Sequence, residues 1–576
     1  MTDTGETSKI IAGMAHGGHA IADDVRNAKQ LSQEGFTLLS EAVQAPVGGG
    51  VRVRTTDFDY MFKKLVGDEQ SHLPAGADTQ RIVKALDALG NAMANQSSDA
   101  TERTSTIPPI FTYWGQFVDH DMTAATDTDS PEELSIRPDV PAPVEPRDIR
   151  RMLVNARNPA LNLDSVYGEG PFTPEPTDPD KVFVPYQPDD PAKLRLGLLD
   201  EQGGPIPPFD DKERDLPRKG GGDLTPLVGD RRNDENLIVA QLHVAFLKFH
   251  NATVDWVRAN EPYRTGVIEV FRRARDLVRW HYQWLCVHDF LKTVALPDAV
   301  GRALSTEDEN MLERLGRRQM PYVPLEYAVA AYRFGHSMVR ASYDWNRNFG
   351  RPASEDTAFD LLFAFTGSGG MFGSNALPST WPAEWERMVD PDSAFPNRFA
   401  RPIDTNLAPP LGDLRNATGP VNVEKLLKQL ARRNLRRGYR LNLPTGQAVA
   451  QQLGLQALSH TELQEGLAEV ASRLVGDTAQ QEAQDLAAGG FDTRTPLWYY
   501  VLREAEVRTQ GNSLGPVGST IVAETVVAHL RFDKTSYLHQ SGQGRYGAWS
   551  PHDGVRLPDG GRVNSIRNFL RFAGVL

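Results

Sequence analysis

The amino-acid sequence predicts a mainly α-helical fold, with a single large helical domain, long ordered loops and little β-structure. Several segments repeat apolar residues with the period of a helix, and strand-like alternation is scarce. The stretch 130–223 is rich in Pro, Gly and Asp, which favours loops that wrap a core. Residues 1–50 end in three glycines and are interpreted as an N-terminal arm, so the domain is expected over residues 51–576.

Helical patterns recur along the whole chain. Residues 107–125 are apolar and aromatic after two prolines, and proline is well tolerated at a helix start. Residues 234–260 begin with acidic side chains, which complement the helix dipole, and continue apolar on nearly all sides. This second helix should therefore lie in the centre of the core. Similar patterns predict helices over residues 266–293, 325–342, 423–436 and 460–475.

Composition excludes several classes of function. The net charge of −13 argues against nucleic acid as a partner, because phosphate binding needs clustered Lys and Arg. The single cysteine, Cys286, allows no intrachain disulfide and no Cys-based metal cluster, and it is expected to be a buried small hydrophobe. No apolar run reaches about 18 residues and no secretory leader is evident, so we expect a soluble cytoplasmic protein without a transmembrane segment, with non-classical export left open.

The segment around His120 combines a polar face with a buried helix. Gln116, Asp119 and His120 fall on one side, and Asp121 is rotated about 100° from His120. A lone histidine in such a helix is usually a core residue with a satisfied ring. The apolar neighbours mark this helix as buried, however, and buried carboxylates need partners.

Three further segments also place polar residues three positions apart, on one helix face. The three pairs are Arg232 with Glu235, Arg333 with His336, and Asn434 with Arg437. Taken alone, the first pair is better explained by helix capping with a surface ion pair, and the third by a solvated basic turn. For the second pair, a core histidine and a ligand are equally good explanations. The short basic cluster 432–437 suggests a local anionic ligand.

Taken together in chain order, these segments resemble the animal-type haem peroxidases of the peroxidase-cyclooxygenase superfamily, in a bacterial-type form. The family motifs Gln-x-x-Asp-His-Asp, Tyr-Arg-x-Gly-His and Asn-x-x-Arg-Gly stand at 116–121, 332–336 and 434–438. Residues 163–168 resemble the end of the family's calcium loop. The resemblance implies a helical haem peroxidase domain that reduces hydrogen peroxide, or an organic hydroperoxide, and oxidises a small one-electron donor or a halide.

The resemblance also implies a role for each matching residue. His120 would be the distal base, Gln116 its polar neighbour, and Arg232 the guanidinium that stabilises charge on the departing oxygen. His336 would bind the haem iron from the other side. Asn434 would accept or orient the hydrogen bond of its second ring nitrogen.

Other matches would surround the haem edge. Arg333 and Arg437 would pair with the propionates, and Asp119 and Glu235 match the positions that form ester bonds to haem in mammalian members. The residue after Glu235 is Asn236, where the member with a third haem link has Met. A sulfonium bond is therefore excluded, and strong chloride oxidation is not expected.

The resemblance further implies a calcium ion beside the distal helix. Asp121 would bind it together with Asn158, the Ala160 carbonyl, Asn162 and Asp164. The two asparagines stand where Thr and Asp are common in the family. Because calcium binds most tightly to charged oxygen ligands, we expect a weak or altered site.

Two other functions are left open. A fatty-acid dioxygenase of the same superfamily usually carries a Tyr three residues before the proximal histidine, where this chain has Arg333. Tyr332 lies one residue further back, on another helix face, which favours a peroxidase. A non-catalytic haem- or calcium-binding structural protein would need neither His120 nor Arg232.

Overall fold

The computed structural model describes most of the chain from residue 56 onward. The predicted arm over residues 1–50 lies outside the described part, so its boundary stays a prediction. The described residues are 56–94, 103–123, 125–127, 142–155, 157–168, 184–201, 208–305, 315, 322–350, 357–390, 398–414, 428–464, 478–544 and 547–576.

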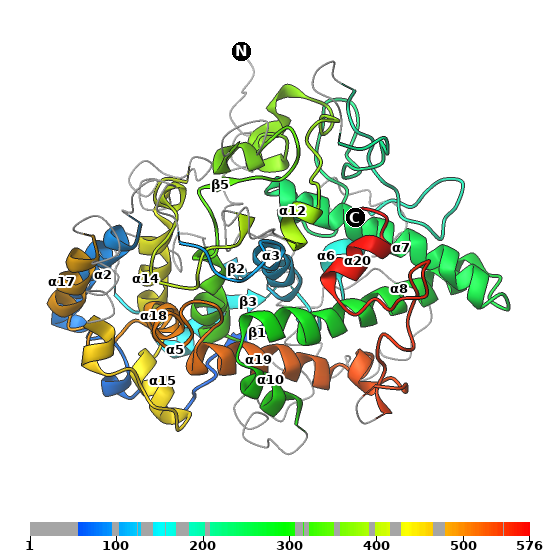
Figure 1. Cartoon of the computed structure of the whole chain (residues 1–576). Helices are drawn as coiled ribbons and strands as arrows, with labels where there is room; N and C mark the ends of the chain where they lie inside the picture. The colour runs from blue at the N-terminus through cyan, green and yellow to red at the C-terminus, as the bar shows by residue number, and fades with distance from the viewer. Residues whose placement is uncertain are drawn as a thin grey trace, which may run out of the picture.

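Helices build the core, as the sequence predicts. The central helix α7 (Leu237–Asn260) packs against α8 (Val267–Leu285) and α3 (Ile110–Met122). Figure 1 shows α3 near the middle of the molecule, with α7 and α8 extending from there to the right edge of the view. The helices α18 (Leu497–Thr509) and α19 (Pro516–Phe532) pack against each other along the same core. Within the described residues, no helix is both long and apolar enough to span a membrane.

Shorter helices surround this core, and several of them are single turns. The remaining α-helices are α2 (Thr79–Ala94), α5 (Pro146–Met152), α6 (Asp164–Tyr167), α9 (Leu291–Val294), α10 (Pro297–Leu304), α12 (Glu386–Val389), α14 (Leu430–Arg440), α15 (Gly446–Gln452), α17 (Thr478–Gly489) and α20 (Ile566–Phe572). The 3-10 and π turns are η3 (Glu69–Ser71), η4 (Gly76–Asp78), η6 (Arg231–Asp234), η7 (Cys286–Phe290), η8 (Glu326–Ala330), η9 (Ala331–His336), η10 (Phe359–Phe363), η11 (Gly367–Gly373), η13 (Pro409–Gly412) and η14 (Tyr537–His539).

The described β-structure is limited to strands of two to four residues. One sheet has the order β2-β3-β1-β4, with β3 antiparallel to both β1 and β2 and with β4 parallel to β1. A second sheet pairs β5 with β6. The strands are β1 (Thr56–Asp59), β2 (Ala125–Asp127), β3 (Leu153–Asn155), β4 (Val323–Pro324), β5 (Ser342–Tyr343) and β6 (Thr357–Ala358).

The helix predicted over residues 234–260 begins later than expected. The Asp230 side chain accepts a hydrogen bond from the Arg232 amide and starts the short turn η6, while the Asn236 side chain caps α7 by accepting from Val239. Two caps six residues apart divide what the pattern presents as one helix. The interior of α7 is buried as predicted, and Phe246 stacks on Phe117 of α3 with ring centroids 4.6 Å apart.

The segment predicted as a helix over residues 325–342 is a π turn followed by a 3-10 turn, η8 and η9, that ends at His336. The Arg333 side chain donates to the Ala328 carbonyl at 2.8 Å and so takes an acceptor that a regular helix would use. A 3-10 turn has three residues per turn, so Arg333 and His336 still share a face.

The other helix predictions hold in part. The range 266–293 is helical from Val267 onward, but a π turn that begins at Cys286 separates α8 from α9. Cys286 is a fully buried free thiol, as predicted. Of the range 423–436, the described part begins at residue 428, and residues 430–436 belong to α14, which continues to Arg440. Residues 460–464 are helical, and the rest of the range 460–475 lies outside the described residues.

Candidate active site

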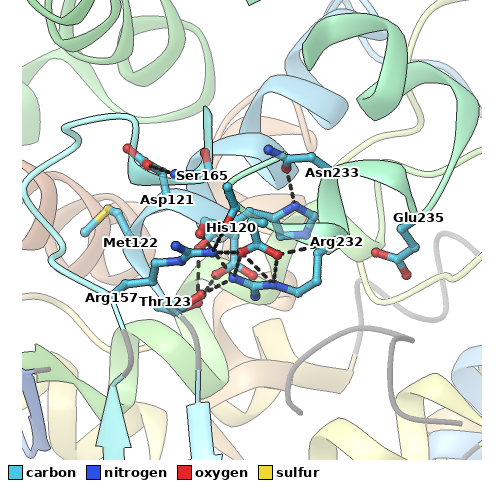
Figure 2. Close-up of polar contacts among 12 residues, drawn as sticks. His120, Asp121, Met122, Thr123, Arg157, Ser165, Arg232, Asn233 and Glu235 are labelled. Atoms are coloured by element: carbon cyan, nitrogen blue, oxygen red, sulfur yellow. Dashed lines mark hydrogen bonds and ion pairs between the residues drawn. The ribbon is translucent and has the colours of Figure 1, made fainter. Parts of the chain in front are cut away.

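His120 lies near the end of α3, almost completely buried. Its Nδ1 contacts Oδ1 of Asn233 at 2.9 Å, and Figure 2 shows the Asn233 amide and the Arg232 guanidinium on opposite sides of the ring. Burial, reinforced by the positive charge of Arg232, lowers the pKa of His120 to about 4. The imidazole is therefore neutral at physiological pH and can accept a proton.

A second histidine stands behind Asn233. The Asn233 amide nitrogen donates to Nδ1 of His243 at 3.0 Å, so its carbonyl oxygen faces His120 and accepts from Nδ1. In this arrangement the His120 proton resides on Nδ1, and Nε2 carries the lone pair. The chain His243–Asn233–His120 thus selects the tautomer that makes Nε2 a base.

Arg232 lies beside His120, and its hydrogen bonds hold it firmly. Nε and Nη2 donate to the Asp230 carboxylate, and Nη2 also donates to the carbonyls of His120 at 3.1 Å and Thr123 at 2.5 Å. Burial raises the pKa of Asp230, but the charges of Arg232 and Arg157 outweigh it and keep this carboxyl ionised. These bonds use Nε and Nη2 of Arg232, and Nη1 is the group that could face a ligand.

Gln116 and Glu235 contact each other rather than the arginine. Gln116 donates to the Glu235 carboxylate at 2.9 Å, and Asn236 donates to the Gln116 carbonyl at 3.1 Å. Asn236 also caps α7, so the start of this helix fixes the orientation of Gln116 on α3. Arg232 and Glu235, predicted as a possible ion pair of a capped helix, are not ion-paired to each other; Arg232 pairs with Asp230.

His336, the predicted iron ligand, ends η9 and is mostly buried. The Asn434 amide nitrogen contacts Nδ1 of His336 at 2.9 Å, which brings together two residues predicted as partners. In this orientation the amide donates to Nδ1. Iron binding at Nε2 requires the amide to turn over, so that Oδ1 accepts from a protonated Nδ1.

An ion pair joins helix α3, which carries His120, to the turn η9, which carries His336. Arg333 donates to the Asp119 carboxylate at 2.9 Å, and Thr123 donates to its other oxygen at 3.0 Å. Burial raises the pKa of Asp119, but Arg333 and Arg232 outweigh it, and the net pKa lies below the usual value. The sequence predicts an ester bond for Asp119 and a propionate for Arg333, whereas in the structure the two side chains hold each other.

The basic cluster 432–437 divides between two faces of α14. Arg432 and Arg436 both bind Asp87 of α2. Arg433 is buried, and burial together with the positive charges of Arg437 and Arg333 lowers its pKa to about 10.

The predicted calcium ligands adopt a different hydrogen-bonding arrangement. Asp121 is fully buried, and its carboxylate accepts from the amides of Leu163 at 3.0 Å and Ser165 at 3.2 Å. The Ala160 carbonyl accepts from Gln283 at 3.1 Å. Burial, with the negative charge of Asp164, raises the pKa of Asp121 to about 7.

The other two predicted ligands lie in the same loop as Asp164. Asn162 accepts from the Asp164 amide at 3.3 Å, and Asn158 is half-buried. Across the described part of the chain, no group of three or more His, Cys, Asp or Glu side chains is arranged to hold a metal ion. Calcium binding stays a prediction.

Sequence reasoning missed three residues that complete the site. Asn233 and His243 select the His120 tautomer, and Asp230 anchors Arg232. Asp230 could have been found as a cap residue two positions before Arg232. A histidine inside an apolar helix gives no comparable signal, because core histidines are common there.

Comparison with known proteins supports a common origin for part of the chain. Residues 188–368 match the sequence model of the animal haem peroxidase family. A stretch of 185 residues is 26% identical to heme peroxidase 2 of Caenorhabditis elegans and covers 28% of this chain and 24% of that protein. The match therefore spans about a quarter of the length of this relative.

Solved structures with a similar fold include a rice enzyme. Fatty acid alpha-dioxygenase of Oryza sativa superposes with a TM-score of 0.52 at 15% identity, over 80% of this chain and 76% of that one. Peroxidase A of Dictyostelium discoideum gives a TM-score of 0.48 at 15% identity, over 84% and 88% of the two chains. The likeness to the rice enzyme supports the mainly helical fold.

Proposed function

Because the chain belongs to the animal haem peroxidase family, we propose that it is a haem-dependent peroxidase that reduces hydrogen peroxide or an organic hydroperoxide. The oxidised product would come from a small one-electron donor or a halide. One observation carries the proposal: a buried, neutral His120 whose Nδ1 is held by Asn233 lies beside the fixed charge of Arg232. This pairing of base and cation is what cleavage of a peroxide bond requires.

The donor set on the other side fits a haem. His336 is a buried imidazole whose Nδ1 is held by Asn434, which leaves Nε2 as the iron ligand once the amide has turned over. Arg333 belongs to the same turn as His336, and Arg437 belongs to the same helix as Asn434; we assign both as partners for propionates. When bound, haem supplies the iron that takes up peroxide and the electrons that reduce it.

The side chains on the His120 side of the site carry out the remaining chemistry. His120 accepts a proton from the incoming peroxide at Nε2 and returns it to the departing oxygen. The Arg232 charge, anchored through Asp230, stabilises the negative charge that develops on that oxygen. The Gln116 side chain, fixed by Glu235 and Asn236, adds an oriented polar group to the same helix face.

Two contacts favour a peroxidase over a fatty-acid dioxygenase. The position three residues before His336 is Arg333, which is ion-paired with Asp119. The neighbouring Tyr332 hydroxyl donates to the Gly115 carbonyl at 3.1 Å and packs beside Tyr327, with ring centroids 4.7 Å apart. This tyrosine is therefore engaged with α3 and does not replace the missing one.

The experiment that tests the proposal uses the full chain loaded with haem. We expect a Soret band that changes on addition of peroxide, turnover of guaiacol with peroxide, and no oxygen uptake with linoleate alone. His120→Ala should retain haem and slow the peroxide reaction by about 100-fold or more. Substitution of the exposed His460 by Ala is the matched control. Absence of a Soret band, or a normal rate in His120→Ala, would overturn the proposal.

Covalent attachment of the haem is a further part of the proposal. Ester bonds would involve Asp119 and Glu235, whose carboxylates contact Arg333 and Gln116. Extraction with acidified acetone tests this point, because haem that stays with the protein is covalently bound. Haem that leaves freely after repeated peroxide treatment would show that these carboxylates serve only as hydrogen-bond acceptors.

A further inference from the structure

The turn η9, which ends at His336, depends on its neighbours for its position. It is a 3-10 turn of six residues that follows the π turn η8, and 3-10 hydrogen bonds have poorer geometry than those of an α-helix. At Gly335, the residue before His336, an added Cβ would meet no atom of the neighbouring described segments within 4 Å. The turn is therefore not packed from the side of Gly335, and contacts on its other sides must hold it.

Trp498 of helix α18 makes one of these contacts. Its indole Nε1 donates a hydrogen bond to the carbonyl oxygen of Arg333 at 3.2 Å, and α18 packs against η9. Trp498 is only 3% exposed, so water has little access to this bond. A hydrogen bond in such a place is costly to break, because neither partner finds a replacement. The indole N–H therefore ties the backbone of the turn to α18.

Arg333 is held both at its side chain and at its backbone. The guanidinium pairs with Asp119 of α3 at 2.9 Å, whereas the carbonyl accepts the hydrogen bond from Trp498 of α18. Arg333 lies three residues before His336, which is one full 3-10 turn. A shift of the Arg333 backbone is therefore transmitted to the His336 ring on the same face of the turn.

The ring of His336 is held by a different helix. The Asn434 amide of α14 contacts Nδ1 of His336 at 2.9 Å. Asn434 and Trp498 line one small cavity of about 20 Å³, which has room for about one water molecule. The two side chains therefore act on the turn from adjacent positions: Asn434 orients the ring, and Trp498 fixes the backbone that carries it.

We propose that Trp498 is a positioning residue for His336. Its indole N–H fixes the backbone of η9 so that the imidazole meets Asn434 through Nδ1 and presents Nε2 to the haem iron. The inference rests on the proposed haem function and deepens it with a residue from a separate helix. Trp498 acts through Arg333 rather than by contact with the reacting atoms.

The test compares Trp498→Phe with Trp549→Phe in the full chain. Both tryptophans are 3% exposed, and among the described residues Nε1 of Trp549 has no hydrogen-bond partner. The two substitutions remove the same atoms from equally buried positions, but only the first breaks a hydrogen bond to the backbone. Trp549→Phe is therefore the matched control for the loss of ring volume.

Hydrogen exchange, read by mass spectrometry, reports on the turn directly. We expect the amides of residues 331–336 to exchange about tenfold faster in Trp498→Phe, the usual effect of one lost hydrogen bond. Trp549→Phe should exchange there at the original rate. Equal exchange in the original chain and in Trp498→Phe overturns the inference.

The haem-loaded protein gives a second readout that does not depend on turnover. Resonance Raman spectroscopy of the reduced form detects the bond between iron and its histidine ligand. We expect this band to broaden and shift in Trp498→Phe and to stay unchanged in Trp549→Phe. Transfer of haem to an excess of a haem-scavenging protein should also be about tenfold faster in Trp498→Phe. An equal shift of the band in both variants would reflect a general loss of packing, and it also overturns the inference.

Replacement of Trp498 by benzothienylalanine isolates the N–H group. This amino acid has the size of tryptophan but carries sulfur in place of the N–H, so the test stays informative if Trp498→Phe fails to fold. We expect the same shifted band and the same faster exchange. Normal behaviour would show that the bulk of the ring positions His336, and the inference would be wrong. An original chain that binds no haem would refute the proposed function instead, and the exchange of residues 331–336 would still decide whether Trp498 holds the turn.

Discussion

Replacing Asn233 by Asp tests whether this residue controls the distal base. The substitution keeps the size of the side chain and places a negative charge at the atom that contacts His120 Nδ1 at 2.9 Å. An opposite charge at this distance favours the protonated imidazole. The pKa of His120 should therefore rise.

The magnitude follows from the contact. The pKa of His120 is about 4, and a carboxylate within about 4–6 Å shifts such a group by about 1–3 units. With a shift of about two units, the neutral fraction of His120 at pH 5 falls from about nine tenths to about one tenth. Since only neutral His120 accepts a proton from peroxide, the rate at pH 5 should fall about tenfold, while the rate at pH 8 changes little for this reason.

Stopped-flow measurement of the Soret change with peroxide, from pH 4 to pH 9, gives the profile directly. In Asn233→Asp, the fall of the rate on the acid side should begin at a higher pH. Asn233→Leu is the matched control: it removes the hydrogen bond without adding charge, so its rate should be lower at all pH values, while the fall on the acid side does not begin at a higher pH. An Asn233→Asp profile that coincides with that of the original chain would refute the assignment of Asn233 and of the His120 tautomer.

Three more predictions concern charge and stability. Arg232→Gln removes one of the two arginines that neutralise the buried negative charge of Asp230. The variant should lower the free energy of unfolding by about 3–5 kcal/mol and should also slow the peroxide reaction. Urea unfolding measures the effect on stability, and unchanged stability would show that Arg157 alone suffices to neutralise Asp230. The haem-loaded protein should lose stability as pH falls from 7 to 5. The unfolded chain takes up protons on its histidines in this range, whereas the buried histidines of the folded chain stay neutral. Burial lowers the pKa of His120, His250, His288 and His529 to about 4 and that of His243 and His281 to about 3. Buried carboxyls act in the opposite sense over the same window, because burial raises the pKa of Asp121, Glu326 and Glu504 to about 7, that of Asp404 to about 6, and those of Asp234 and Asp289 above the usual value. We expect the six imidazoles to outweigh these carboxyls, and stability that rises on acidification would contradict this balance. Calcium at about 1 mM should raise the melting temperature by less than about 1 °C, as for a site with a dissociation constant near 10⁻³ M, and micromolar binding in calorimetry would contradict it.

The sequence alone was sufficient to predict features that depend on interactions within one short segment. The spacing in residues 116–121 predicts that Asp121 leaves the face of His120, and in the structure Asp121 turns to the amides of Leu163 and Ser165. The apolar pattern after Asn236 likewise predicts the central helix, because a helix that is apolar on all sides must be buried. The pairing of Asn434 with His336 came from the family motif, and the structure places these two side chains in contact.

Helix ends and turns were less predictable, because they depend on single side chains. The division between η6 and α7 follows from two capping residues, and the shape of the turn before His336 depends on the bond from Arg333 to the Ala328 carbonyl. A periodic pattern does not register such bonds.

Only the tertiary structure decided which charged and polar groups meet. Asn233 and His120 are 113 residues apart, and Arg333 and Asp119 are 214 apart. The two faces of the basic segment on α14 became distinct only when Asp87 was seen to hold one of them. The spacing of residues within one helix predicts which side chains share a face of that helix. The partner of a buried charge depends on how separate helices pack against each other, so the spacing within one segment does not predict it.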